Sequence, residues 1–214
     1  MSIPKESITT VVFDAHGTLW EPNLQATFEH ISSKLGIPKT HRHIFKEHLI
    51  NSLLKLPHIL NDKMITTKLL ADSLNFLIHD TLKECNVKAM DIIQALCVPT
   101  NVLCSNPNGK EILDTIMYLW KCNYRIILKS NWPSEVQVVK LREFKLFPYF
   151  EAIYGPLGSY FKPNEKGAKK FLNGLNPEHF IMIGDSITYD IKFAKNTGMY
   201  SIWLNQNHKK ILQI

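Results

Sequence analysis

The residue types that could carry chemistry stand just after short apolar runs. A β-branched run beginning at Ile8 stops at Asp14, and later runs end at Ser130-Asn131 and at Gly184-Asp185. Lys162 follows a further run after a short loop. Short apolar runs rich in β-branched residues are typical of buried strands. Ligands of open α/β sheets bind beyond the carboxyl ends of the strands, so these polar residues are candidates for one site.

The candidate set has the chemistry of phosphoryl transfer. The carboxylates of Asp14, Asp185 and Asp190 would repel one another at one sheet edge unless a cation neutralised them. Carboxylate oxygens are ligands that Mg²⁺ prefers. The Ser130 hydroxyl and the Lys162 ammonium suit an anionic group in transfer, and an aspartate can act as the nucleophile. The residues therefore indicate a magnesium site that handles phosphate.

Strand and helix patterns alternate over the second half of the chain. Together with the first run, strands are expected near residues 8–13, 124–128, 152–154, 180–184 and 200–204. Helices are expected between them near residues 110–121, 133–145, 163–172 and 187–196. Strands that alternate with helices imply parallel pairing, so the sequence predicts an α/β fold with a doubly wound, Rossmann-like parallel sheet.

The segment from residue 20 to residue 108 shows helical spacing and no strand signal. Helices are expected near residues 24–35, 40–55, 63–85 and 87–97, with Pro57 ending the second. The turn-rich segment 99–109 returns the chain to the sheet. The prediction is a core of residues 1–19 and 109–214 and a helical insertion of residues 20–108.

Composition narrows the class of protein. The 214 residues are 45% hydrophobic and 21% charged, which is ordinary for a globular protein, and no apolar run approaches the ~20 residues of a membrane helix. The four cysteines form no Cys-x-x-Cys pair, which favours free thiols and a cytoplasmic location. The net charge of +6 suits an anionic small molecule, and the scattered Lys and Arg residues do not favour nucleic acid. No feature predicts an oligomeric state.

Four segments of the chain resemble the motifs of the haloacid dehalogenase (HAD) superfamily of phosphatases and related hydrolases. In the family's order, they are Val-Val-Phe-Asp14-Ala-His16-Gly17-Thr18-Leu19, Ile-Leu-Lys-Ser130-Asn131, Lys162-Pro163 and Ile-Gly184-Asp185-Ser-Ile-Thr-Tyr-Asp190. The helical insertion resembles the family's small α-helical cap. The resemblance implies a Mg²⁺-dependent phosphatase that acts on a small phosphate ester through an aspartyl phosphate on Asp14.

The resemblance also implies the metal ligands. Asp14 would be the nucleophile, with one of its oxygens on Mg²⁺. The backbone carbonyl of His16 and the carboxylate of Asp185 would bind the metal, and Asp190 would bind it directly or through water.

The remaining site residues would bind substrate. The resemblance implies that Ser130 and Lys162 hold the phosphoryl group and that Asn131 orients the substrate or the nucleophile. Trp132 is expected near the pocket, and Arg42 with the lysines of the insertion could close over a phosphorylated substrate.

His16 departs from the family's phosphatase pattern. Phosphatases of the family usually carry a second Asp two residues after the nucleophile, which protonates the leaving group and then activates water. A histidine, with an ordinary pKa of ~6.5, can do both. Two alternatives stay open here: a catalytically impaired HAD-like protein that binds a ligand or partner, and a metal-independent haloacid dehalogenase. The acidic pair Asp185 and Asp190, which dehalogenases lack, favours the phosphatase.

Overall fold

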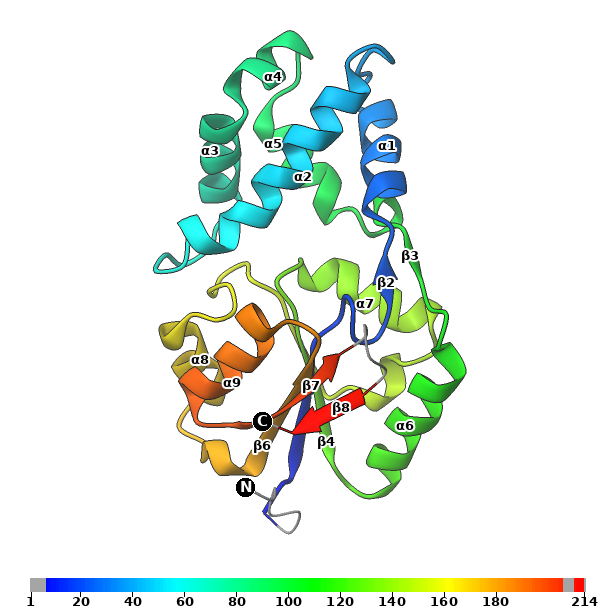
Figure 1. Ribbon diagram of the computed structural model, residues 1–214, viewed down its shortest axis with the longest axis vertical. Helices are drawn as coiled ribbons and strands as arrows, with labels where there is room; N and C mark the ends of the chain where they lie inside the picture. Colours follow the sequence, from blue (N-terminus) through cyan, green and yellow to red (C-terminus); the bar gives the residue numbers. More distant parts are fainter. Residues whose placement is uncertain (1–6, 206–209, 214) are drawn as a thin grey trace.

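A six-stranded sheet forms the centre of the core (Figure 1). The structure, a computed structural model, describes residues 7–205 and 210–213. The strand order is β5-β4-β1-β6-β7-β8, and every neighbouring pair is parallel except β7 and β8. The strands are β1 Thr10–Phe13, β4 Arg125–Lys129, β5 Ala152–Tyr154, β6 Phe180–Gly184, β7 Tyr200–Asn205 and β8 Lys210–Gln213. The predicted α/β fold with a parallel sheet is confirmed, and the antiparallel strand β8 is an addition to it.

Helices cover both faces of the sheet, and β1 is therefore buried throughout. Val11 and Phe13 pack in a cluster with residues of α6 and α7. Val12, which points the other way, packs in a second cluster with residues of α8 and α9. The core helices are α6 Gly109–Lys121, α7 Ser134–Glu143, α8 Glu165–Leu172 and α9 Lys192–Thr197. Shorter helices are η1 Pro99–Asn101, η2 Phe147–Tyr149, η3 Pro177–His179 and the π-helix η4 Ile187–Ile191.

The helical insertion forms a separate layer over the carboxyl edge of the sheet (Figure 1). Its helices pack around a core of their own, in which Phe28, Phe45, Leu49 and Leu74 are almost fully buried. The helices are α1 Leu24–Lys34, α2 Arg42–Ile59, α3 Thr67–Leu77, α4 His79–Glu84 and α5 Ala89–Cys97.

An antiparallel ribbon joins the insertion to the core. Strand β2 (Glu21–Pro22) pairs with strand β3 (Cys104–Ser105) where the chain leaves the core and where it returns. The expectation of no strand in this segment is therefore wrong. Two-residue strands are too short to show the alternation by which a strand is found in a sequence.

Two helices of the insertion differ from their predicted bounds. Helix α2 continues through Pro57 to Ile59, because the proline lies in the last turn, where the Leu60 N–H still donates to the Leu56 carbonyl at 2.9 Å. The single helix expected over 63–85 is instead α3 and α4, which meet at Ile78. The apolar spacing runs on across that break, so the pattern gave no sign of it.

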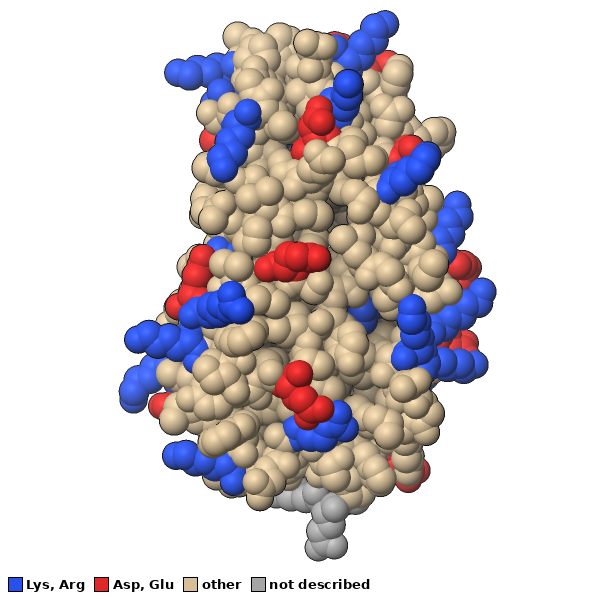
Figure 2. All heavy atoms as spheres, turned by 180° about the vertical axis from the view of Figure 1, so that it is seen from behind, with Lys and Arg blue, Asp and Glu red and all other residues tan. Residues whose placement is uncertain are grey.

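The surface mixes charges of both signs. Figure 2 shows the face opposite to that of Figure 1, where Lys and Arg are interspersed with Asp and Glu rather than gathered in one patch. Within the described ranges, no helix has the length and apolar character needed to cross a membrane. All four cysteines are free thiols.

Candidate active site

Strand β1 delivers Asp14 to the middle of the carboxyl edge of the sheet. Phe13 pairs with Leu128 of β4 and with Ile183 of β6, so Asp14 comes level with the ends of both neighbours. The Asp14 N–H donates to the Ile183 carbonyl at 2.9 Å, which continues the pairing to the site. Gly17 then turns the chain with a φ of +81°, and a side chain there would collide with the Asp185 carboxylate.

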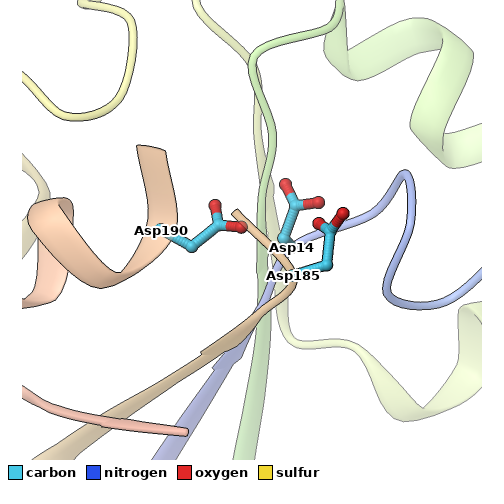
Figure 3. Close-up of side chains that lie close together, drawn as sticks. All are labelled: Asp14, Asp185 and Asp190. Atoms are coloured by element: carbon cyan, nitrogen blue, oxygen red, sulfur yellow. The ribbon is translucent and has the colours of Figure 1, made fainter. Parts of the chain in front are cut away.

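Asp185 and Asp190 approach Asp14 from the end of β6. Oxygens of the three carboxylates lie within 4.8 Å of one another (Figure 3). Asp190 comes from η4, so the helix predicted over 187–196 begins as a π-helix, a form that is frequent at functional sites. The Ser186 N–H donates to Asp190 Oδ2 at 3.0 Å and fixes that carboxylate. The structure therefore gathers the predicted acidic ligands in one place.

Crowding and burial make it costly for these carboxylates to carry charge. Burial first, and then Asp190, raises the pKa of Asp185 to about 6. Burial first, and then Asp14, raises the pKa of Asp190 to about 6. Burial also raises the pKa of Asp14, with Lys162 acting in the opposite direction. A divalent cation would relieve this repulsion, and an all-oxygen set of carboxylates fits Mg²⁺.

Lys162 is the buried cation of the site, with 1% of its surface exposed. Its Nζ donates to Oδ1 of Asp14 and, at 2.6 Å, to Oδ1 of Asp190. Burial acts to lower the pKa of the ammonium, but the two carboxylates outweigh that effect and the pKa is raised. Lys162 therefore stays charged and binds both carboxylates.

Ser130 and Asn131 follow β4 at the same edge. The Asn131 amide is bound on both sides to the backbone of Lys162: its Oδ1 accepts the Lys162 N–H at 2.7 Å and its Nδ2 donates to the Lys162 carbonyl at 3.2 Å. The Ser130 Oγ accepts the Trp132 N–H at 3.1 Å. In the structure Asn131 therefore positions Lys162, a role that the sequence analysis did not give it.

His16 lies between two tryptophans. Its ring centroid is 5.0 Å from that of Trp132 and 6.1 Å from that of Trp20. Among the described residues, its Nε2 has no hydrogen-bond partner. Burial first, and then Lys162 and Lys140, lowers the pKa of His16 to about 3. His16 is therefore a neutral imidazole at pH 7 and a weaker base than an ordinary histidine.

These residues border a cavity of about 390 Å³ between the sheet and the insertion. We call its core side the floor; its polar side chains are Asp14, His16, Ser130, Asn131, Lys162, Asp185, Ser186, Tyr189 and Asp190. We call its insertion side the roof; it consists of Pro22, Leu24, Phe28, Ile50, Leu53, Leu54, Leu56, Pro57, Leu70, Ile93, Leu96 and Cys97. Trp132 borders the cavity as predicted.

Three cationic side chains of the insertion bind partners within the insertion itself. Arg42 pairs with Glu29 at 3.1 Å, and Lys46 pairs with the same carboxylate at 2.7 Å. Lys34 donates to Asn101 Oδ1 at 2.7 Å. None of the arginines and lysines of the insertion is among the residues that border the cavity in the described chain, so closure of these cations over a substrate stays a prediction.

A comparison with protein families decides the assignment. The sequence profile of the haloacid dehalogenase-like hydrolases matches residues 8–198. The chain belongs to this family. The HAD hydrolase therefore has the fold and the family that its four motif segments indicated.

Two relatives resemble part of this HAD hydrolase in sequence. The HAD-hydrolase YfnB of Bacillus subtilis (strain 168) is 30% identical over 93 residues, which is 40% of this chain and 38% of YfnB. The pyrimidine 5'-nucleotidase PynA of Streptococcus pneumoniae is 28% identical over 102 residues, 46% of this chain and 42% of PynA. The matches thus span about two fifths of either relative.

Solved structures share the fold over nearly the whole chain. The crystal structure of YfnB bound to magnesium has a TM-score of 0.63 at 20% identity and covers 92% of this chain and 89% of that one. The L-2-haloacid dehalogenase from Xanthobacter autotrophicus has a TM-score of 0.60 at 16% identity, with coverage of 91% and 76%. The same architecture therefore serves enzymes with different names.

Lys129 of the HAD hydrolase was missed by sequence reasoning. Only 2% of its surface is exposed, and its Nζ donates to the carbonyls of Gly155 at 3.2 Å and of Tyr160 at 3.4 Å. These hydrogen bonds stabilise the loop that carries Lys162. Burial first, and then Lys162, lowers the pKa of Lys129 to about 7. The available signal was a lysine directly after the apolar run of residues 126–128.

Tyr189 was also missed, and it links the floor to the insertion. Its hydroxyl lies 3.0 Å from His58 Nε2 and donates to the Leu54 carbonyl at 3.5 Å. No sequence signal could have found this contact, since it depends on how the insertion lies over the core.

Proposed function

We propose that this HAD hydrolase is a Mg²⁺-dependent phosphatase that cleaves small phosphate monoesters through an aspartyl phosphate on Asp14. The observation that carries the proposal is the cluster of Asp14, Asp185 and Asp190 within 4.8 Å, with Lys162 bound to two of the three. Such a site combines a nucleophile with the positive charge that phosphoryl transfer needs. The relative PynA, named a nucleotidase, supports phosphate as the group transferred.

The metal would bind at the acidic cluster. Asp14, Asp185, Asp190 and the His16 carbonyl are the proposed ligands. Bound there, Mg²⁺ supplies positive charge to the phosphoryl oxygens and to the carboxylates that burial makes costly to ionise. The solved structure of YfnB bound to magnesium supports this choice of ion.

The side chains divide the remaining work in the proposed reaction. A carboxylate oxygen of Asp14 attacks phosphorus, the ester P–O bond breaks, and the alcohol leaves with a proton from solvent. Lys162 and Ser130 hold the phosphoryl oxygens. His16, which borders the same cavity as Asp14, then takes a proton from water, whose oxygen attacks the same phosphorus and frees phosphate and Asp14. We place the reaction in the cytoplasm because all four thiols are free.

The test is phosphate release from 4-nitrophenyl phosphate with Mg²⁺ and with excess chelator. The Asp14→Asn variant should lose at least about a thousandfold in kcat, because the nucleophile is gone. The Asp91→Asn variant, an exposed carboxylate on α5, is the matched control and should keep wild-type activity. Full activity in Asp14→Asn would remove Asp14 from the reaction.

A second assay, for halide release, separates the two alternatives from the phosphatase. A solved structure of the Xanthobacter dehalogenase has chloropropionic acid covalently bound, so halide release from 2-chloropropionate is the comparison reaction. Halide release that the chelator leaves unchanged would replace the phosphatase with a dehalogenase. A wild-type protein that binds Mg²⁺ but releases neither product would indicate the ligand-binding alternative.

A further inference from the structure

The floor and the roof of the cavity differ in charge. The charged side chains that border the cavity, Asp14, Lys162, Asp185 and Asp190, all belong to the floor. In the part of the chain that the structure describes, every roof residue is apolar or a cysteine. A substrate whose phosphate lies on the floor therefore has its leaving group against an uncharged surface.

The roof combines buried residues of the insertion's core, such as Phe28 and Leu56, with apolar side chains that remain partly open. In α2, Phe45 and Leu49 are fully buried in the core of the insertion. Ile50 and Leu53 of the same helix are only partly buried, and Leu54 is 57% exposed. Apolar surface left open to water is stabilised when an apolar ligand covers it. The apolar residues of helix α2 thus pack in the core of the insertion and also border the cavity, where Leu54 is the most exposed of them.

The walls next to the floor continue this apolar surface. Trp132 and Pro133 follow the Ser130-Asn131 segment, and Leu157 and Phe161 belong to the loop before Lys162. A group that extends from the phosphate toward the insertion is therefore enclosed by apolar side chains at its sides as well as above.

A second anionic group would find no partner there. Arg42 and Lys46 are both engaged by Glu29 and do not border the cavity. Burial of a carboxylate or phosphate without a paired charge is strongly unfavourable. Monoesters whose leaving group carries such an anion should therefore be poor substrates.

Resting on the proposed phosphatase function, we infer that the substrate is a phosphate monoester of an apolar aliphatic or aromatic alcohol without a second charged group. The floor binds the phosphate, and the roof binds the hydrocarbon. The cavity volume of about 390 Å³ is at the small end for ligand pockets, which suits a small alcohol.

The experiment compares primary alkyl phosphates from ethyl to hexyl with the ω-carboxyalkyl phosphates of matched length. These alcohols are similarly poor leaving groups, so differences in kcat/KM report contacts with the hydrocarbon. Each added CH₂ should raise kcat/KM about fourfold until the cavity is filled. The terminal carboxylate should lower kcat/KM at least about a hundredfold relative to the methyl-ended ester.

A charge placed on the roof should reverse the preference. Leu53→Lys puts an ammonium on the cavity from a partly buried position and should favour the carboxylate-ended ester over its methyl-ended match. Leu69→Lys is the matched control: Leu69 is also partly buried on the insertion but does not border the cavity, so the wild-type preference should remain.

The outcomes distinguish a failure of the apolar substrate class from a failure of the proposed phosphatase activity. Phosphate release that Asp14→Asn abolishes, with no dependence on chain length or with a preference for the carboxylate, overturns the apolar substrate class alone. No phosphate release from any ester in the presence of Mg²⁺ overturns the proposed phosphatase and the substrate class together. A rising alkyl series that Leu53→Lys reverses supports both.

Discussion

The floor and the roof of the cavity are stabilised in opposite ways. On the floor, Lys162 binds Asp14 and Asp190, and Asn131 holds the Lys162 backbone in place. On the roof, apolar side chains face the cavity, and Leu54 is left 57% exposed. The floor is therefore held by polar contacts among its own residues, whereas the exposed part of the roof is stabilised when an apolar ligand covers it. Under the proposed function, we expect the core to carry out the reaction and the insertion to select the ester.

The largest loss of activity should come from removing the positive charge of Lys162 on the floor. Lys162→Met removes the charge shared by two carboxylates, so we expect kcat/KM for 4-nitrophenyl phosphate to fall about a thousandfold with saturating Mg²⁺. The exposed Lys166, on the following helix, is the matched control, and Lys166→Met should stay within about twofold of wild type. A loss below tenfold in Lys162→Met would show that the floor does not depend on this lysine.

His16 should give the next largest effect. His16→Ala removes the proposed proton acceptor for water, so we expect kcat to fall about a hundredfold and phosphoenzyme to accumulate. Rapid-quench kinetics should then show a burst of one alcohol per enzyme. His16→Asp, which restores the usual residue of the family's phosphatases, should keep or raise turnover. An unchanged rate in His16→Ala would exclude His16 from the mechanism.

The contrast between the floor and the roof also explains which parts of the molecule could be predicted from the sequence. The floor residues sit at strand ends in short segments such as Phe13-Asp14 and Gly184-Asp185, so their order along the chain already predicted that they meet. The roof residues come from several helices, and their spacing is that of any buried helix face. Nothing in that spacing separates Leu53, which borders the cavity, from Leu49, which is buried in the core.

Contacts between distant segments were not readable for the same reason. The break between α3 and α4 and the ribbon of β2 with β3 depend on tertiary packing that local apolar spacing does not encode. The contact of Tyr189 with His58 depends on how the insertion lies over the core. The role of Asn131 could be found only from the structure, because its partner Lys162 is 31 positions away in the sequence.

Lys129 is another buried lysine of the core and differs from Lys162 in its partners. Its Nζ binds backbone carbonyls, whereas Lys162 binds carboxylates. The pKa of Lys129 is lowered to about 7, while the unfolded chain has the ordinary value of 10.5. Between these values the unfolded chain binds a proton that the folded chain lacks, so stability rises with pH. From pH 6 to pH 9, wild type should gain about 3 kcal/mol in free energy of unfolding relative to Lys129→Met.

Urea unfolding at both pH values measures this difference. The change with pH is the readout, because the Met variant also leaves the Gly155 and Tyr160 carbonyls without their donor, which shifts stability equally at every pH. Lys166→Met, at an exposed position, should follow wild type at both pH values. Parallel curves for wild type and Lys129→Met would show that Lys129 keeps an ordinary pKa.

The smallest effect should come from Tyr189, where the floor and the insertion touch. Tyr189→Phe removes the hydroxyl that lies 3.0 Å from His58 and donates to the Leu54 carbonyl, so a partly exposed hydrogen bond is lost. Such bonds contribute about 0.5 kcal/mol, so KM should rise about twofold while kcat stays unchanged. His58→Ala should do the same, and the double variant should be no worse than either single one, because both remove one shared contact. Additive losses in KM would show that Tyr189 and His58 act separately and that the hydrogen bond between them does not hold the roof over the floor.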